Sequence, residues 1–385
     1  MADYVIVVMS PDFVQRGEGA LIDKWVRARM ALLAGADLVL ELPVRYACAS
    51  AESFAKGSVS LLSSLGVVDA LSFGYEPILP LRDEAMPDPE EVRILKETAA
   101  FFAGEETESF RQTLLSLLNT GMTYAQARME AYLHMQDPES ANKKRSLLRS
   151  PNNILAVEYL RALHTEPGDL EVIPIPRRGA VYNDLLLPED QNAFASASAI
   201  RSALGRKEDV RSYMPPEAGL LLEQAFSERR TLTLADLDLL MHESLLRKAD
   251  HLQDYLDVST DLANRIRNLT GEYTGFESFA ALLKTRQITL TRSRRALLHI
   301  LLGLKKENRP ISYARVLGFR KTAGPLLHSI SQKSRVPLVT KLPGPGSLPE
   351  GLREDLHASM LWEMAVCHKT GKPMPNEYSR QLVIL

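Results

Sequence analysis

Continuous apolar runs alternate with amphipathic stretches along the first part of the chain. Residues 4–9 form an apolar run without alternation, which is typical of a strand buried on both faces of a parallel sheet. Asp23 can cap a helix that leads to a strand at residues 36–42, and Ser50 can cap a second helix before a strand at residues 67–73. This alternation predicts right-handed crossovers and a parallel sheet, so the expected fold class is α/β.

The pattern resumes after a less regular interval. Residues 77–108 are rich in Pro, Asp and Glu, which predicts a surface excursion, and helical stretches follow to about residue 136. Ser150 then precedes a proline at the first position of a helix, and residues 170–176 read as another strand. Residues 194–201 are predicted to form a second ligand loop that enters a helix.

Helical periodicity replaces the strand pattern after about residue 205. Helices are predicted near residues 215–228, 233–246, 251–269, 276–285 and 291–304, with a little β structure around 336–341. A chain of 385 residues with 45% apolar content is long enough for two cores. We therefore predict an α/β domain over residues 1–205 and a mainly helical domain over residues 206–385.

Bulk composition narrows the functional classes only slightly. The formal net charge of −2 means that a nucleic-acid partner would have to meet a local basic patch. Cys48 and Cys367 lie in apolar surroundings and are interpreted as core residues of a protein from a reducing compartment. No run approaches the roughly 20 apolar residues of a membrane span, and no signal peptide is visible, so we expect a soluble, cytoplasmic protein.

Polar residues gather where predicted strands end and helices begin. Ser10, Gly74 and Arg177 each follow a different strand, while Asn152 and Ser198 fall in first turns of helices. The carboxyl ends of parallel strands share one edge of a sheet, where α/β proteins bind ligands. Helix-start amides accept phosphate, and an arginine can hold phosphate oxygens in two-pronged fashion. The set predicts a nucleotide pocket.

Three structural alternatives remain open for members of this set. Gly74 can serve only to turn the chain, and Ser150 can serve only as a helix cap. Arg177 can pair with Asp184 instead of a phosphate.

Several longer runs resemble a known family: MSPDFVQRG, GADLVLELP, SAESFAKG, LSFGYE, SPNNILAVEYL, IPRRGAVYND, ASASAIR and YARVLGF. They are similar to the bacterial tRNA(Met) cytidine acetate ligase family, and the match extends from residue 5 to about residue 341. That family is similar to the HxGH-type nucleotidyltransferases. The resemblance implies a Rossmann-like parallel-sheet nucleotidyltransferase domain, which binds ATP, followed by a mainly α-helical domain that binds tRNA.

The resemblance also implies an activity. Members activate acetate with ATP, giving acetyl-adenylate and pyrophosphate, and pass the acetyl group to N4 of the wobble cytidine of elongator tRNA(Met). Carried over by position, it implies ATP contacts at Gly74, Asn152 and Arg177. Ser198 and Arg201, in a run similar to the ISSTxIR phosphate loop, are the candidate catalytic residues. Mg²⁺ is expected to arrive with the ATP phosphates, and no metal ligand of the protein is predicted.

The HxGH signature of the family is absent, because none of the eight histidines has another three residues away. The chain enters directly at what the family uses as its second strand, so a strand, loop and helix are expected to be missing through truncation. If the chain is the natural product, its sheet would lack a central strand and its catalysis would be impaired.

The first loop also departs from the family pattern SGxFxQRG, because Pro11 stands where the family usually has glycine. Ser10, Gln15 and Arg16 of this loop are candidates for acetate, phosphate or cytidine contacts. The alternative for Gln15 and Arg16 is a structural role, with a salt bridge to Glu18 or Glu41.

Residues 286–321, called the basic segment below, carry an excess of positive charge. Phosphates of a folded RNA suit such a density of cations, and Tyr313 could stack on a base. A solvated charged face is the alternative. The predicted tRNA contacts are Arg292, Arg294, Arg295, Lys305, Lys306 and Arg315. A second cluster, Lys143, Lys144, Arg145 and Arg149, could approach the anticodon arm or form a solvated helix end.

Other site classes find no support in the sequence. It contains no zinc-type Cys pair, no HExxH, no P-loop, no GxGxxG and no GxSxG. Two rival functions stay open: a nucleotidyltransferase that adenylates a small phosphorylated metabolite, and a non-catalytic tRNA-binding protein.

Overall fold

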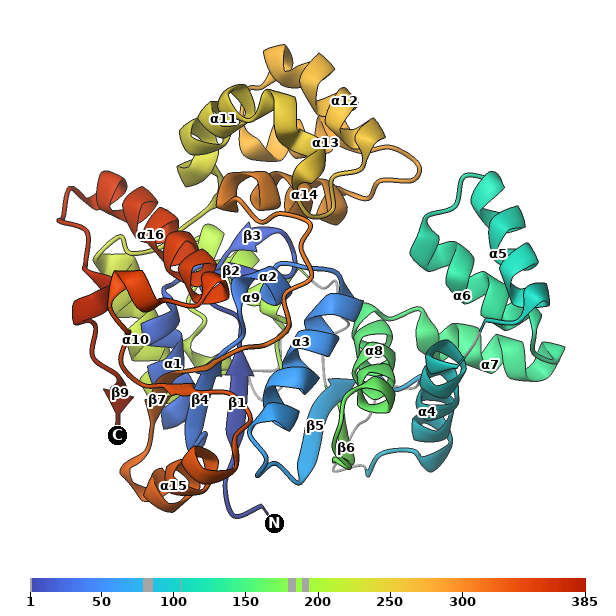
Figure 1. Cartoon of the computed structure of the whole chain (residues 1–385), viewed down its shortest axis with the longest axis horizontal. Coiled ribbons are helices and arrows are strands. Elements are labelled where there is room, and N and C mark those ends of the chain that lie inside the picture. Colours follow the sequence, from blue (N-terminus) through green and yellow to red (C-terminus); the bar gives the residue numbers. More distant parts are fainter. Residues whose placement is uncertain (1, 79–85, 105, 179–184, 189–193) are drawn as a thin grey trace. The chain divides into compact units, whose positions relative to one another are not determined.

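The computed structural model describes residues 2–78, 86–104, 106–178, 185–188 and 194–385 (Figure 1). The chain divides into two compact units: Met1–Val67 together with Leu221–Leu385, called unit 1, and Val68–Leu220, called unit 2. None of the described helices combines the length and the apolar character needed to cross a membrane.

Unit 1 is built on a mixed sheet with the order β1-β4-β7-β8, in which β9 also pairs with β7. Its strands are β1 (Ile6–Met9), β4 (Leu38–Glu41), β7 (Ala314–Phe319), β8 (Leu338–Val339) and β9 (Val383–Ile384). The β1–β4 pair is parallel, as predicted, but β7 runs antiparallel to β4. A short hairpin of β2 (Phe13–Val14) and β3 (Glu18–Gly19) follows β1.

The predicted caps position the first helices of unit 1. The Asp23 carboxylate accepts hydrogen bonds from the amides of Trp25 and Val26 at the start of α1 (Lys24–Leu33). Ser50 caps α3 (Ala51–Ser64), and Gly66, with φ +69°, follows the end of that helix. A short helix α2 (Val44–Ala47) precedes α3.

An apolar core of unit 1 includes Trp362 and Phe276, both fully buried. The helices that contribute to this core are α11 (Asp238–Arg247), α12 (Thr260–Leu269), α13 (Phe276–Leu283), α14 (Leu290–Leu302) and α16 (Glu350–Thr370). Helix α15 (Gly324–Lys333) also belongs to unit 1, and α10 (Pro216–Ser227) spans the boundary between the units. Most of the predicted helices after residue 205 therefore exist, although 251–269 is interrupted between a 3-10 turn and α12.

Unit 2 contains one parallel pair, β5 (Ala70–Tyr75) with β6 (Glu171–Pro176). Helix α8 (Pro151–Thr165) packs against β5, and the rings of Phe73 and Tyr159 stack 5.5 Å apart. The helices are α4 (Pro89–Ala103), α5 (Glu108–Asn119), α6 (Tyr124–His134), α7 (Pro138–Leu148), α8 (Pro151–Thr165) and α9 (Ala197–Gly205). Residues 89–103 therefore form a helix within the interval that was predicted to be a surface excursion.

The compact units differ from the predicted boundary at residue 205. The carboxyl-terminal part of the chain is not only helical, because it supplies β7, which pairs with β4 across some 280 residues of sequence. Local periodicity carries no information on a partner so distant. The reason that β7 was missed is also local, since Arg315 interrupts its apolar run.

Candidate nucleotide-binding site

Strands β5 and β6 end side by side in unit 2. Tyr75 lies opposite Pro176, and the amide of Arg177 donates to the carbonyl of Tyr75 at 2.8 Å, which continues the ladder by one residue. Glu76 and Arg177 therefore leave the carboxyl ends of two parallel strands together, where α/β sheets bind ligands.

Gly74 lies within β5, opposite Ile175, so it does not turn the chain. Its φ angle is not among the positive values, and a Cβ atom there would lie 3.4 Å from Cγ of Arg177. The residue is exposed, and the side chain of Ile175 next to it is 55% exposed. The absence of a side chain therefore leaves open surface beside Arg177, and the backbone conformation does not require glycine.

A carboxylate that the sequence analysis did not single out lies at the centre of the predicted site. Glu76 accepts hydrogen bonds from Ser150 Oγ at 2.5 Å and Asn152 Nδ2 at 2.6 Å. Its contact with Arg177 Nη1, at 3.5 Å, is an ion pair and a long hydrogen bond. We call Glu76, Ser150, Asn152 and Arg177 the Glu76 cluster; the run LSFGYE was the only sequence signal for its central residue.

The buried side chain of Asn153 supports the cluster through hydrogen bonds to the backbone of Glu76. It is 1% exposed, and its Nδ2 donates to the carbonyls of Glu76 and Leu147, both at 2.7 Å. Its Oδ1 accepts the amide of Glu76 at 2.7 Å. All the polar atoms of this side chain are thus satisfied internally, which makes Asn153 a structural residue and leaves Asn152, half-buried beside it, to face a ligand.

The cluster can bind a nucleotide with complementary groups. Arg177 retains a guanidinium that is 38% exposed and that shares only one long contact with Glu76. Ser150 is both the cap of α8 and a donor to Glu76, so its capping role does not exclude a role in the site. The alternative partner of Arg177, Asp184, lies outside the described residues.

Ser198 and Arg201 lie on α9, whose cap is Ser196. The Ser196 hydroxyl accepts the amide of Ala199 at 2.9 Å, so this run does enter a helix as predicted. Arg201 is exposed and Ser198 is half-buried. Their contact with a nucleotide remains a prediction.

The loop after β1 belongs to unit 1. Arg27 donates to the carbonyls of Ser10 and Pro11 at 2.9 and 2.5 Å, which fixes the start of the loop. Gln15 and Arg16 lie half-buried at the tip of the β2–β3 hairpin. Burial raises the pKa of the carboxyl of Asp12, in the same loop, to about 6.

Acidic residues from outside the basic segment engage much of its positive charge. Arg294 forms ion pairs with Glu18, at 2.8 Å, and with Glu277. Arg295 pairs with Asp257 at 2.9 Å. Neither arginine is fully buried, since the side chains of Arg294 and Arg295 are 20% and 14% exposed.

Only part of the predicted tRNA surface is open to solvent. Lys305 and Lys306 are exposed, and Arg292 is half-buried. These three residues remain the best candidates for contacts with phosphate. The second cluster is also largely paired, because Lys143 contacts Glu90, Lys144 contacts Glu97 and Arg145 contacts Glu130.

Arg315 and Tyr313 correct the prediction for the basic segment. The Arg315 side chain is 3% exposed and forms ion pairs with Glu41 at 3.2 Å and with Glu377 at 2.9 Å. Tyr313 is 2% exposed and donates its hydroxyl to Asp355 Oδ2 at 2.5 Å. Both lie at β7 in the interior of unit 1, so Arg315 cannot contact RNA phosphate and Tyr313 cannot stack on a base.

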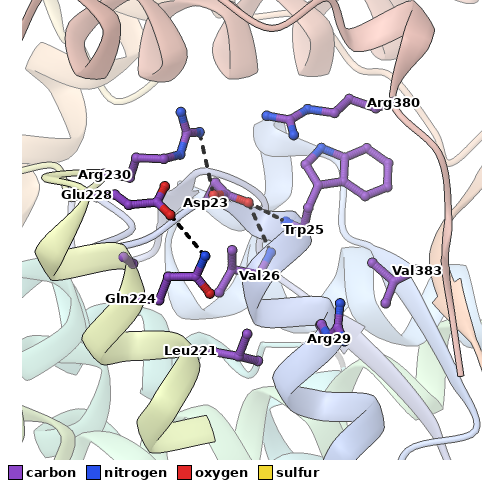
Figure 2. A pocket seen from close by; sticks show the side chains of 11 residues that line it. Asp23, Trp25, Val26, Arg29, Leu221, Gln224, Glu228, Arg230, Arg380 and Val383 are labelled. Carbon is purple, nitrogen blue, oxygen red and sulfur yellow. Dashed lines mark hydrogen bonds and ion pairs between the residues drawn. The ribbon is translucent and has the colours of Figure 1, made fainter. Parts of the chain in front are cut away.

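A cavity of about 310 Å³ in unit 1 contains none of the predicted site residues (Figure 2). Two of the arginines in its wall are paired: Arg230 contacts Asp23 and Glu363, and Arg380 contacts Glu363. Among the residues that the structure describes, no group of three or more His, Cys, Asp or Glu side chains could hold a metal ion. The cavity is therefore not part of the site that the sequence predicts.

The chain is similar to known proteins over most of its length. The profile of the family described as HIGH Nucleotidyl Transferase matches residues 1–374. A tRNA(Met) cytidine acetate ligase of Caldanaerobacter subterraneus subsp. tengcongensis is 37% identical over 372 residues, covering 94% of this chain and 88% of the relative. One from Clostridium tetani is 30% identical over 373 residues, with the same coverage.

Solved structures give the same answer for the fold. The crystal structure of Thermotoga maritima TmcAL (apo, form I) superposes with a TM-score of 0.87 at 27% identity, covering 100% of this chain and 92% of that one. The form of that protein bound with alpha-thio ATP gives a TM-score of 0.85. The nucleotidyltransferase-like fold is confirmed, and the chain belongs to the HIGH nucleotidyl transferases and, among them, to the family of tRNA(Met) cytidine acetate ligases.

Proposed function

We propose that this protein is an ATP-dependent ligase that acetylates N4 of the wobble cytidine of tRNA(Met) through an acetyl-adenylate. The Glu76 cluster carries the proposal, because Glu76, Asn152 and Arg177 come from three separate segments and meet within hydrogen-bond or ion-pair distance, with Gly74 beside Arg177. Support comes from the names of the relatives and from the ATP analogue bound by the Thermotoga maritima protein. A ligase acting on tRNA would work in the cytoplasm.

The proposed reaction has two balanced steps. A carboxylate oxygen of acetate attacks the α-phosphorus of ATP, the bond to the β-phosphate oxygen breaks, and pyrophosphate leaves. The cytidine N4 then attacks the acetyl carbonyl, AMP leaves, and N4 loses a proton. Because acetate is already ionised, the first step depends mainly on positioning and on stabilising the charge that develops on the phosphates.

The ATP-binding role predicted for residues 1–205 is proposed here for the Glu76 cluster of unit 2. Arg177 would hold the phosphates through its exposed guanidinium, and Gly74 would let the nucleotide approach the strand. Ser198 and Arg201, at the start of α9, would assist at the phosphates. Mg²⁺ would be held by ATP itself, since the described residues supply no ligand cluster for it.

Unit 1 would supply the contacts with the other substrates. Ser10, Gln15 and Arg16 are proposed to contact acetate or the cytidine. The exposed Lys305 and Lys306, with Arg292, are proposed to meet the tRNA backbone, which positions the RNA without reading its sequence. This replaces the broader tRNA surface predicted for residues 206–385.

The test follows each step separately. ATP binding is measured by calorimetry, adenylation by acetate-dependent exchange of labelled pyrophosphate into ATP, and transfer by mass spectrometry of cytidine from tRNA(Met). We expect exchange to require acetate and transfer to require tRNA. Pyrophosphate exchange that does not require acetate but requires a phosphorylated metabolite would favour the rival nucleotidyltransferase. Binding of tRNA without binding of ATP would favour a non-catalytic tRNA-binding protein.

A further inference from the structure

The Asn152 amide is oriented by a neighbour that can only accept hydrogen bonds. Its Nδ2 lies 2.6 Å from Oε1 of Glu76. A carboxylate has no hydrogen to donate, so the amide atom that faces it must be the nitrogen. The oxygen of Asn152 is therefore fixed at the other position, where it has no partner among the described residues.

Glu76 is itself held firmly. Its two carboxylate oxygens receive Ser150 Oγ and Asn152 Nδ2, with Arg177 nearby. Its backbone amide and carbonyl are both bound by the buried Asn153. The Glu76 carboxylate is thus a rigid reference that sets the orientation of Asn152, and turning the amide over would place its oxygen against the carboxylate.

The fixed oxygen requires a hydrogen-bond donor on the ligand. The phosphates of ATP carry none, which leaves the 6-amino group of adenine or a ribose hydroxyl. Gly74 and the adjacent, largely exposed Ile175 offer an apolar surface on which a flat purine can lie next to Asn152. A hydroxyl can donate or accept, so only the base gives a reason to fix the amide.

We propose that Glu76 is a positioning residue that presents the Asn152 oxygen to the base, so that the site selects purine nucleotides with a 6-amino group over those with a 6-oxo group. This rests on the proposed function, in that ATP is taken to bind at the Glu76 cluster. Beyond that function, Glu76 and Asn152 together would discriminate adenine from hypoxanthine and guanine.

The test compares the dissociation constants of ATP, ITP and 2′-deoxyATP by calorimetry. The wild-type protein should bind ITP at least about tenfold more weakly than ATP, because the 6-oxo group meets an acceptor and leaves it unpaired. It should bind 2′-deoxyATP nearly as well as ATP. An equally large loss for 2′-deoxyATP, without a loss for ITP, would assign Asn152 to the ribose and overturn the proposal.

The Glu76→Gln variant tests the orienting role. A glutamine amide can both donate and accept, so Asn152 can turn over and the preference for ATP over ITP should fall to within about twofold. The matched control is Glu90→Gln, an exposed glutamate of α4 that pairs with Lys143 and Arg93. The control should keep the full preference, and a preference unchanged in Glu76→Gln would refute the role of Glu76.

A double variant, Glu76→Gln with Asn152→Asp, distinguishes a lost hydrogen bond from general damage to the structure. Asn152→Asp alone brings two carboxylates together and should weaken ATP binding. Combined with Glu76→Gln, the new glutamine can donate to the new aspartate, whose second oxygen again faces the base, and the preference for ATP should return. Failure of the double variant to recover it would count against the mechanism even if both single variants behave as expected.

The inference and the proposed function can fail separately. If the wild-type protein does not bind ATP, the proposed function is wrong. If it binds ATP and ITP equally, the function stands and the inference is wrong. Asn152→Ala removes the amide without touching Glu76 and should abolish the preference by an independent route, which covers the case in which Glu76→Gln fails to fold.

Discussion

The Glu76 cluster and the basic segment illustrate two different outcomes for charged and polar residues that a sequence singles out. In the Glu76 cluster, Asn152 and Arg177, which lie 76 and 101 positions from Glu76, meet it within hydrogen-bond or ion-pair distance. In the basic segment, residues only ten positions apart diverge, with Arg315 in the interior and Lys305 on the surface. Strand ends are brought together by topology, whereas local charge density says nothing about the partners that neutralise it.

The largest effect is expected at the Glu76 cluster. Arg177→Ala removes the exposed guanidinium proposed to hold the phosphates and should abolish measurable ATP binding, a loss of at least about 100-fold, while tRNA binding is unchanged. Calorimetry and gel-shift assays measure the two affinities. The control is Arg93→Ala, an arginine of α4 that is 61% exposed. If Arg177→Ala lost ATP affinity and tRNA affinity equally, the Glu76 cluster and the basic segment would not have separate binding roles.

The next effect separates an interior arginine from a binding residue. Arg315→Ala leaves the buried Glu41 and the largely buried Glu377 with Lys24 as their remaining ion-pair partner among the described residues. The two carboxylates then share one cation inside unit 1, which should lower the free energy of unfolding by about 3–5 kcal/mol. Denaturant unfolding measures this change, with the exposed Arg353→Ala as a control expected within about 0.5 kcal/mol of wild type. If Arg315→Ala were as stable as the wild type but bound tRNA more weakly, Arg315 would instead be an RNA-binding residue.

The third prediction concerns the acid that accepts the Tyr313 hydroxyl. Burial raises the pKa of the Asp355 carboxyl to about 7, so the folded protein retains a proton that the unfolded chain loses near pH 4. The stability associated with that proton is complete at low pH and is lost as the pH rises through about 7. Between pH 5 and 7 this group should lower the free energy of unfolding by about 2 kcal/mol.

Asp355→Asn tests this pH dependence. The asparagine can still accept the amide of Val44, which lies 2.7 Å from Oδ1, and can donate to Tyr313. It does not titrate, so its unfolding free energy should fall less steeply over the same pH range. Parallel slopes for the wild type and Asp355→Asn in urea unfolding would show that another group is responsible. Asp12, whose pKa is also raised, would be the first to examine.

The smallest effect is expected at the exposed lysines of the basic segment. The Lys305→Ala/Lys306→Ala protein should bind tRNA a few-fold more weakly and lose about one unit of salt dependence per lysine, without a change in stability. Filter binding at several salt concentrations measures both quantities. Lys333→Ala/Lys341→Ala removes two exposed lysines outside the segment and serves as the control. Identical salt dependence in the two proteins would contradict an RNA-binding role for Lys305 and Lys306.

Elements with strong local signals could be predicted from the sequence. Asp23, Ser50 and Ser150 were identified as caps, and each accepts the expected backbone amide. The β5–β6 pair also lies close to its predicted residues, although one face of the pair is exposed at Ile173 and Ile175. The convergence of Gly74, Asn152 and Arg177 followed from these elements together with the rule for strand ends.

What could not be predicted depends on distant partners. Glu76 was overlooked because a single glutamate after a strand has no distinctive spacing, and its role is visible only with Ser150 and Asn152 beside it. Arg315 looked like a surface cation because its partners, Glu41 and Glu377, lie far away in sequence. Whether a charged residue is neutralised by a distant partner depends on the tertiary structure, so the local sequence does not reveal it.

The antiparallel pairing of β4 with β7 has a consequence for the order in which the protein can fold during synthesis. Unit 2 is one uninterrupted stretch, Val68–Leu220, and can acquire its core as soon as it leaves the ribosome. The amino-terminal strands are translated earlier but must wait for residues 314–319, so nascent β4 carries an unsatisfied edge for most of translation. Chaperones that shield such an edge should therefore matter more for the first 67 residues than for the 153 that follow them.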